Sequence, residues 1–236
     1  MRHYLPTLIG VAEADDATIS ALQITSGGAG FVLGTTTDGR QVVVQLFGPE
    51  PINYAVVGGL AIRQVIVFRA LALGAQIIVK THRPHTWGSF MRIAGGMRGD
   101  LHCVAELGSL PPATAQRPLL AVLDSDSSLG SGRLAGGPWT AMISATDHAT
   151  QWNADDLARV DVVFAQSLSS TSAKVLANAL SLPDNGAGLV GLSDGQLSLA
   201  ARGALERVDV TMTATERWIT GARNPQDSDN AAQAAI

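Results

Sequence analysis

A pair of glycines, Gly58 and Gly59, stands between a short apolar run at residues 54–57 and a helical pattern at residues 60–73. In an α/β fold, such a strand–glycine–helix junction can direct the backbone N–H groups of a helix N-terminus at a phosphate. The loop matches neither G-x-G-x-x-G nor G-x-x-x-x-G-K-[ST], and it lacks the Lys and the Ser or Thr of a P-loop. A tight turn with close helix packing is the other use of this pair, so phosphate binding here is a hypothesis.

An acidic residue, Asp124, ends the apolar run at residues 119–124. A carboxylate at the carboxyl end of a buried strand can organise magnesium, as a Walker B aspartate does. Residues 160–166 form another apolar run that ends in a polar residue, Gln166, as the sensor strands of P-loop ATPases do. Because any buried parallel strand can end in a polar residue, Asp124 is either a ligand-binding residue or a loop cap.

The densest cluster of cationic and aromatic side chains lies at residues 80–87, between a predicted strand and a predicted helix. This is the functional edge of an α/β sheet, where Arg83 and His85 could hold an anion with Trp87 as a wall. The alternative is a solvated loop in which Thr86 caps the helix and Trp87 anchors it to the core. The candidate ligand-binding residues are Gly58, Gly59, Arg83, His85, Trp87 and Asp124.

The sequence offers no clear catalytic nucleophile, metal site or cofactor. The one cysteine, Cys103, lies in an apolar strand pattern and is typical of a core residue. Asp147 and His148 have Ser144 nearby, but no G-x-S-x-G motif accompanies them. The histidines of the 80–87 cluster lack the i, i+4 spacing and acidic support of a metal pair. We therefore assign no catalytic residue, no metal and no cofactor, and we lean against an enzyme.

The elements that must position these residues alternate between strand and helix from residue 52 onward. The apolar runs predict strands, and the periodic segments, with Ser or Thr at one start and Gly or Pro at the ends, predict helices. The predicted strands are 54–57, 76–80, 101–107, 118–123, 139–145 and 160–165. The predicted helices are 60–73, 86–93 and 170–182, with a helical turn at 155–159 and a loop at 125–138.

The sequence predicts β structure near both ends of the chain. Strand patterns at 21–24, 30–34 and 41–47 include an Asp-Gly turn signal, and further hairpins are predicted over 188–192, 196–200 and 207–213. The fold class is α/β: a mostly parallel sheet with flanking helices, Rossmann-like or degenerate RecA-like, with N-terminal and C-terminal β-hairpin elements. We divide the chain into an N-terminal hairpin element (1–50), an α/β domain with closing hairpins (51–222) and a disordered tail (223–236).

Composition and charge argue against a nucleic-acid-binding protein and against a membrane-spanning one. The chain has 236 residues, of which 46% are hydrophobic and 15% charged, so a large core is expected. A net charge of −4 gives no electrostatic reason to expect nucleic acid as a partner. The hydrophobic stretch at residues 54–79 contains Arg63 and Arg69, which would be costly in a bilayer, and no targeting signal is visible. We expect a cytoplasmic protein without a direct membrane span, either free or held peripherally at the inner membrane.

The order of the motifs along the chain resembles that of a known protein family. Residues 46–51, 57–59, 68–75 and 83–87, taken in sequence, resemble EccE-like proteins of actinobacterial type VII (ESX) secretion systems. Residues 118–218 are similar in layout to the back half of an FtsK-type ATPase domain. EccE-like proteins typically begin with membrane-spanning helices, and FtsK-type motors need a P-loop. This sequence shows neither membrane-spanning helices nor a P-loop, so the resemblance implies a pseudo-ATPase.

Two functions remain. The first is a noncatalytic accessory or scaffold protein that acts by protein–protein interaction with type VII secretion components, as the resemblance implies. The alternative is a nucleotide-binding Rossmann-like enzyme with an atypical phosphate loop, in which Asp124 is the acid and Arg83 clamps a phosphate. The β segment at 41–47 carries no charge, and the segment at 188–200 carries only Asp194, in a turn; we therefore predict a homodimer or a heteromeric contact through one of them. In a monomer, the two terminal β segments would instead pair with each other.

Overall fold

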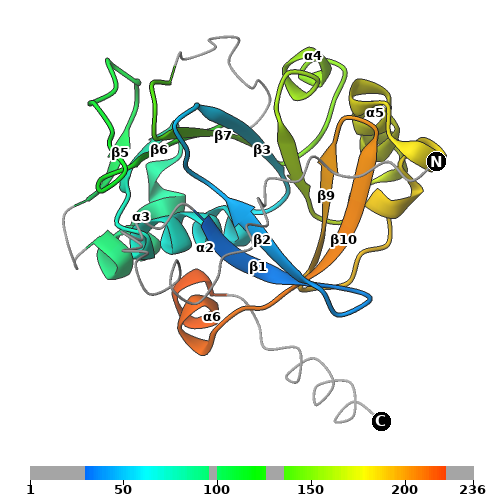
Figure 1. Ribbon diagram of the computed structural model, residues 1–236, viewed down its shortest axis with the longest axis horizontal. Coiled ribbons are helices and arrows are strands. Elements are labelled where there is room, and N and C mark those ends of the chain that lie inside the picture. The colour runs from blue at the N-terminus through cyan, green and yellow to red at the C-terminus, as the bar shows by residue number, and fades with distance from the viewer. Residues whose placement is uncertain (1–29, 96–99, 126–135, 222–236) are drawn as a thin grey trace, which may run out of the picture.

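One mixed sheet organises the chain (Figure 1). The computed structural model describes residues 30–95, 100–125 and 136–221. Ten strands follow the order β2-β1-β10-β9-β8-β3-β7-β6-β4-β5. Helices flank the sheet, which confirms the predicted α/β class.

The parallel part of the sheet comprises β3 (Ile52–Val57), β4 (Gln76–Thr81), β5 (Leu101–Val104), β6 (Leu119–Asp124), β7 (Thr140–Thr146) and β8 (Val162–Ala165). The central strands are continuous apolar runs because both faces of a helix-covered parallel sheet are buried. Every residue of β6 is buried, including the terminal aspartate. Five of these strands lie within one or two residues of their predicted bounds, while β5 ends earlier, at Val104 rather than residue 107.

Two apolar layers cover opposite faces of β3. Val56 packs into a cluster with α2 (Leu60–Ala72), α3 (Pro84–Ala94) and α6 (Ala214–Thr220). Ala55 and Val57 point the other way, into a cluster with α4 (Ala154–Leu157) and α5 (Ser170–Leu180). This alternation follows from the two-residue period of a strand. None of the helices in the described ranges is both long enough and apolar enough to cross a membrane.

Four antiparallel strands extend the sheet beyond β8: β9 (Gln196–Ala201), β10 (Ala204–Val210), β1 (Gly30–Thr36) and β2 (Gln41–Gln45). β1 pairs with β10, with Thr35 opposite Asp209, so the N-terminal and C-terminal β segments pair within one chain. A register shift between Val32 and Gly34 interrupts the pairing of β1 with β2. An added Cβ on Gly34 would lie 1.9 Å from the backbone oxygen of Asp209, so only glycine allows this close approach.

Several sequence expectations differ from the structure. The strand predicted at 188–192 is wrong: residues 183–189 form a 3₁₀ segment, η2 (Pro183–Leu189), in which Leu189 is buried against α5 and Gly186 has positive φ. Helix α3 begins at Pro84 rather than residue 86 because Pro fits the first turn. Helix α6 was not predicted. The expected strand at 21–24, the tail at 223–236 and most of the loop at 125–138 lie outside the described residues.

Candidate functional site

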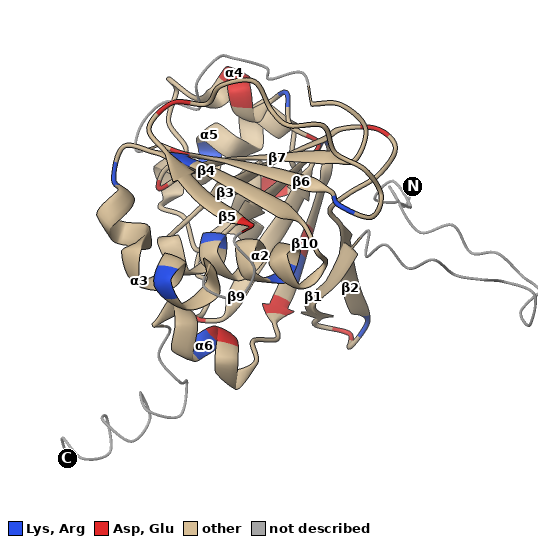
Figure 2. Ribbon diagram, turned by 90° about the vertical axis from the view of Figure 1, so that its left-hand side faces the viewer, with Lys and Arg blue, Asp and Glu red and all other residues tan. Residues whose placement is uncertain are grey.

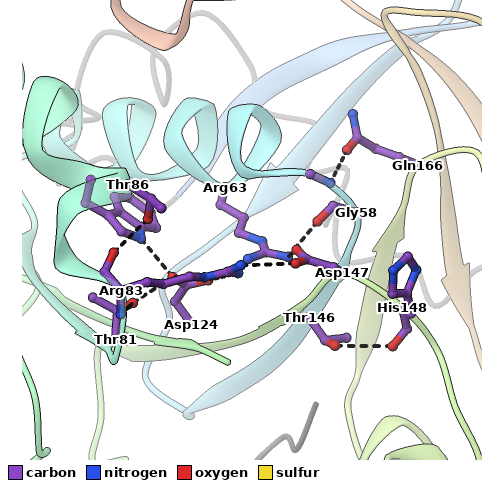
Figure 3. A network of polar contacts seen from close by, with 12 residues as sticks. Gly58, Arg63, Thr81, Arg83, Thr86, Asp124, Thr146, Asp147, His148 and Gln166 are labelled. Carbon is purple, nitrogen blue, oxygen red and sulfur yellow. Dashed lines mark hydrogen bonds and ion pairs between the residues drawn. The ribbon is translucent and has the colours of Figure 1, made fainter. Parts of the chain in front are cut away.

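Polar side chains from several segments meet at the carboxyl edge of the parallel strands (Figure 3). In register, Val57 lies opposite Thr146 and Ala165, and Thr81 lies opposite Asp124. The residues that follow these strand ends are therefore brought together. In open α/β sheets this edge is where ligands bind.

Arg63 lies at the centre of this edge. It stands one turn into α2, and its side chain is directed back toward the start of the helix, as helical side chains are. The side chain is 0% exposed. Its Nη1 donates to Asp124 Oδ1, and its Nη2 donates to Asp147 Oδ1 and, at 2.6 Å, to the carbonyl oxygen of Gly58. Arg63 Nε has no partner among the described residues.

Asp124 is held by donors from three further residues. Thr81 Oγ1 and Trp87 Nε1 each donate to Asp124 Oδ2 at 2.9 Å. Arg83 Nη2 donates to Asp124 Oδ1 at 3.2 Å. With Arg63 included, both carboxylate oxygens carry more than one donor, so the carboxylate is saturated by the protein itself.

Arg83 and Asp147 form the solvent-facing half of the same network. Arg83 Nη1 donates to Asp147 Oδ2 at 3.1 Å, so each arginine contacts both aspartates. The two guanidinium groups and two carboxylates balance to zero formal charge. This pairing offsets the desolvation cost that buried single charges would carry.

Both aspartates are ionised at neutral pH. Burial on its own raises the pKa of Asp124, but hydrogen bonds from Arg83, Trp87 and Thr81 and the charge of Arg63 bring it below its ordinary value. Burial also raises the pKa of Asp147, and the hydrogen bond from Arg83 with the charges of Arg63 and Arg83 again lowers it. For Arg83, burial alone lowers the pKa, yet its bonds to the two carboxylates leave it raised.

The glycine pair makes a two-residue connection between β3 and α2. Gly59 N–H donates to Gln166 Oε1 at 2.6 Å, and the Gly58 carbonyl accepts from Arg63. A P-loop instead needs several consecutive backbone N–H groups that curve around a phosphate. Here one of the N–H groups at this helix start is already occupied by the side chain at the end of β8.

The contact with Gln166 predicts different outcomes for the two glycines. A Cβ on Gly58 would lie 2.6 Å from Gln166 Oε1 and 3.0 Å from Gln166 Cβ, whereas a Cβ on Gly59 would come no closer than 3.4 Å. We expect Gly58→Ala to lower the free energy of unfolding by about 1–3 kcal/mol, the usual cost of overpacking. Urea titration should show a much smaller change for Gly59→Ala. Adding Gln166→Ala to Gly58→Ala should recover part of the loss, and no recovery would contradict this cause.

The sequence-derived candidates occupy different places. Gly58, Gly59, Arg83 and Asp124 meet at the edge of the sheet. Trp87 is fully buried, in T-shaped contact with Phe90, and reaches Asp124 through its indole N–H. His85 is exposed on the first turn of α3 and takes no part in the network drawn in Figure 3.

The sequence did not identify Arg63 as a site residue, and it suggested Asp147 only as part of a catalytic triad that lacks its G-x-S-x-G motif. A signal for Arg63 existed: an arginine one turn after the Gly-Gly junction of a mostly apolar helix is directed back toward the carboxyl edge. Cys103 is half-buried, and burial raises the pKa of its thiol. Across the part of the chain that the structure describes, no three His, Cys, Asp or Glu side chains gather as a metal site would require.

Comparison with known proteins identifies the fold. No protein-family profile and no curated sequence matches the chain. The cytoplasmic domain of the Thermomonospora curvata type VII secretion ATPase EccC superposes with a TM-score of 0.51 at 14% identity, over 86% of this chain and 30% of that one. The cytoplasmic domain of EssC gives 0.47 at 11% identity, over 78% and 43%. The pCW3 conjugation coupling protein TcpA, solved with ATPγS, gives 0.48 at 12% identity, over 89% and 73%.

The likeness to the EccC domain defines a class of fold. The chain spans less than a third of the EccC domain and less than half of the EssC domain. At 14% identity the likeness to EccC shows a shared RecA/FtsK-like α/β architecture, and it does not show a shared activity. The function must therefore be argued from the site.

Proposed function

We propose that the protein is a noncatalytic accessory module of a type VII secretion system that acts through protein–protein contacts. The fold likeness to the EccC cytoplasmic domain and the EccE-like order of motifs support the secretion setting. We place it on the cytoplasmic side, held at the inner membrane by its partner complex. Its partners would be other components of that system.

The observation that carries the noncatalytic part is the position of Arg63. In a P-loop ATPase, a Lys and backbone N–H groups meet the phosphates, while the P-loop Ser or Thr and a Walker B Asp hold magnesium. In this chain the guanidinium of Arg63 lies between Asp124, Asp147 and the Gly58 carbonyl at that edge. The guanidinium of Arg63 thus lies beside Asp124, in the place where a Walker B aspartate would hold magnesium.

Nucleotide binding would require this network to open. Admitting magnesium at Asp124 means moving the guanidinium of Arg63 away from this carboxylate, which leaves a buried cation without that acceptor. The side chain of Gln166 would also have to leave the N–H of Gly59. These costs favour a closed structural site over the alternative of a nucleotide-binding enzyme.

A thermal-shift experiment separates the two functions. We expect no change in melting temperature with millimolar Mg-ATP, Mg-GTP, NAD or nucleotide sugars. A ligand present at 100 times its Kd would add about 2.7 kcal/mol, which is a visible shift. A clear shift with any of them that is lost in Asp124→Asn would support the enzyme and overturn the noncatalytic proposal.

The secretion setting is tested separately. The full chain, immobilised and exposed to an actinobacterial lysate, should retain type VII secretion core components identified by mass spectrometry. Arg92→Glu, a change on an exposed position of α3, serves as a variant for mapping the contact surface. Retention of unrelated metabolic enzymes alone would contradict the proposal.

A further inference from the structure

The strand β2 lies at one edge of the sheet. It pairs with β1 on one side, and no other described strand pairs with its second side. Its sequence, Gln41-Val42-Val43-Val44-Gln45, contains no charged residue. Figure 2 shows β2 in tan, the colour of uncharged residues. The turn that precedes it contains the charged residues Asp38 and Arg40. Natural edge strands usually carry charges or Pro that prevent pairing with another strand.

An apolar stripe continues from this edge onto the neighbouring strand. Val43 and Val32 are register partners on β2 and β1, and each is 47% exposed. Val44, the next residue along β2, is buried in the core. The outward face of the edge therefore presents Gln41, Val43 and Gln45, with Val32 beside the central valine.

The sequence of β2 is palindromic, which makes the edge complementary to a copy of itself. We propose that two copies of the chain pair through β2 as antiparallel strands, with a twofold axis at Val43. In this register Val43 faces Val43 of the second copy, and Gln41 faces Gln45 at each end. A twofold interface requires such self-complementarity. No like charges meet across it, and the apolar stripe becomes four valines wide.

The structure excludes the other segment considered from the sequence. β9 (Gln196–Ala201), the strand that overlaps residues 188–200, has β8 on one side and β10 on the other, so it offers no free edge. This leaves β2 as the candidate of the two. A five-residue strand pair buries less than the ~800 Å² per partner of standard interfaces, so the dimer is expected to be weak.

Disulfide trapping tests the register with a matched control. In a background with Cys103→Ser, Val43→Cys places two thiols on strands whose opposed Cα atoms lie about 4.5–5.5 Å apart, which a disulfide can bridge. Val32→Cys is equally exposed, but three strand spacings of about 4.8 Å separate the two copies at that position, which is too far. We expect rapid oxidation to a dimer for Val43→Cys at high protein concentration and little for Val32→Cys.

Solution measurements complete the test. Sedimentation at rising concentration should show a dimer for the native chain and a folded monomer for Val43→Lys. Equal trapping of both cysteine variants, or a dimer that Val43→Lys leaves intact, would overturn the proposal in favour of another interface. A native chain that stays monomeric to millimolar concentration would also overturn it. If that chain dimerised only after removal of residues 1–29, the edge would belong to the chain's own N-terminal segment.

Discussion

Replacing Arg63 with methionine is expected to lower the free energy of unfolding by about 3–5 kcal/mol, the usual cost of removing one partner from a buried ion pair. Within the described residues, the change leaves the buried carboxylate of Asp124 and the adjacent Asp147 with Arg83 as their one remaining arginine partner. It also leaves the carbonyl of Gly58 without its donor. Urea titration at neutral pH should report this as a large fall in the unfolding midpoint.

Arg92→Met is the matched control because Arg92 is exposed on α3 and its guanidinium donates a hydrogen bond to the hydroxyl of Ser89, also on the surface. Surface substitutions of this kind usually change stability by less than about 0.5 kcal/mol. A second variant, Arg63→Met with Asp124→Leu, removes both charges of the buried pair and should recover part of the loss. Equal effects of Arg63→Met and Arg92→Met would contradict a central role for the Arg63 network.

The parallel sheet could be predicted from the sequence because strands buried on both faces must be continuous apolar runs. The runs at 76–80, 118–123 and 160–165 each correspond to a strand within one or two residues. Helix α6 could not be found in the same way. It has seven residues, its Trp218 is exposed, and a contact with Arg69, 147 positions away, holds it.

The site could be predicted only in part, again because some of its contacts join residues that are far apart in the sequence. Asp124 and the glycine pair stand at strand ends, so their meeting at one edge follows from local pattern and the rule for parallel sheets. The burial of Arg63 depends on Asp124 and Asp147, which are 61 and 84 positions away. A periodicity argument assigns an isolated arginine in a helix to solvent, because it has no information on such distant carboxylates.

A second buried arginine, Arg69, joins the N-terminal hairpin to the C-terminal helix. Its Nε donates to Glu216 Oε1 at 2.6 Å and its Nη2 to Glu216 Oε2 at 3.1 Å. Its Nη1 donates to the carbonyl oxygens of Val32 and Leu33, and its guanidinium lies 5.5 Å from the ring of Phe31. Glu216 also accepts from the backbone N–H of Thr213, closing the capping box of α6.

Replacing Glu216 with alanine is therefore expected to lower the free energy of unfolding by about 3–5 kcal/mol at neutral pH, because the guanidinium of Arg69 stays buried without its carboxylate. Glu206→Ala is the matched control: Glu206 is partly exposed, its 3.7 Å pair is with the exposed Arg40, and such surface pairs contribute about 0–1 kcal/mol. Urea titration of both variants beside the native chain measures the difference. Similar losses for the two would show that the Arg69 contact does not stabilise the fold.

The same carboxylate predicts how the effect changes with pH. Burial raises the pKa of Glu216, but hydrogen bonds from Arg69 and Thr213 and the charge of Arg69 bring it below its ordinary value of 4.5. A group with a lowered folded pKa contributes fully above its unfolded pKa, and its contribution is lost as pH falls through the folded value. The stability gap between the native chain and Glu216→Ala should therefore be constant from pH 7 to about pH 5 and narrow below pH 4.5. A gap that widened in acid would mean that the protonated form is the one that Arg69 stabilises.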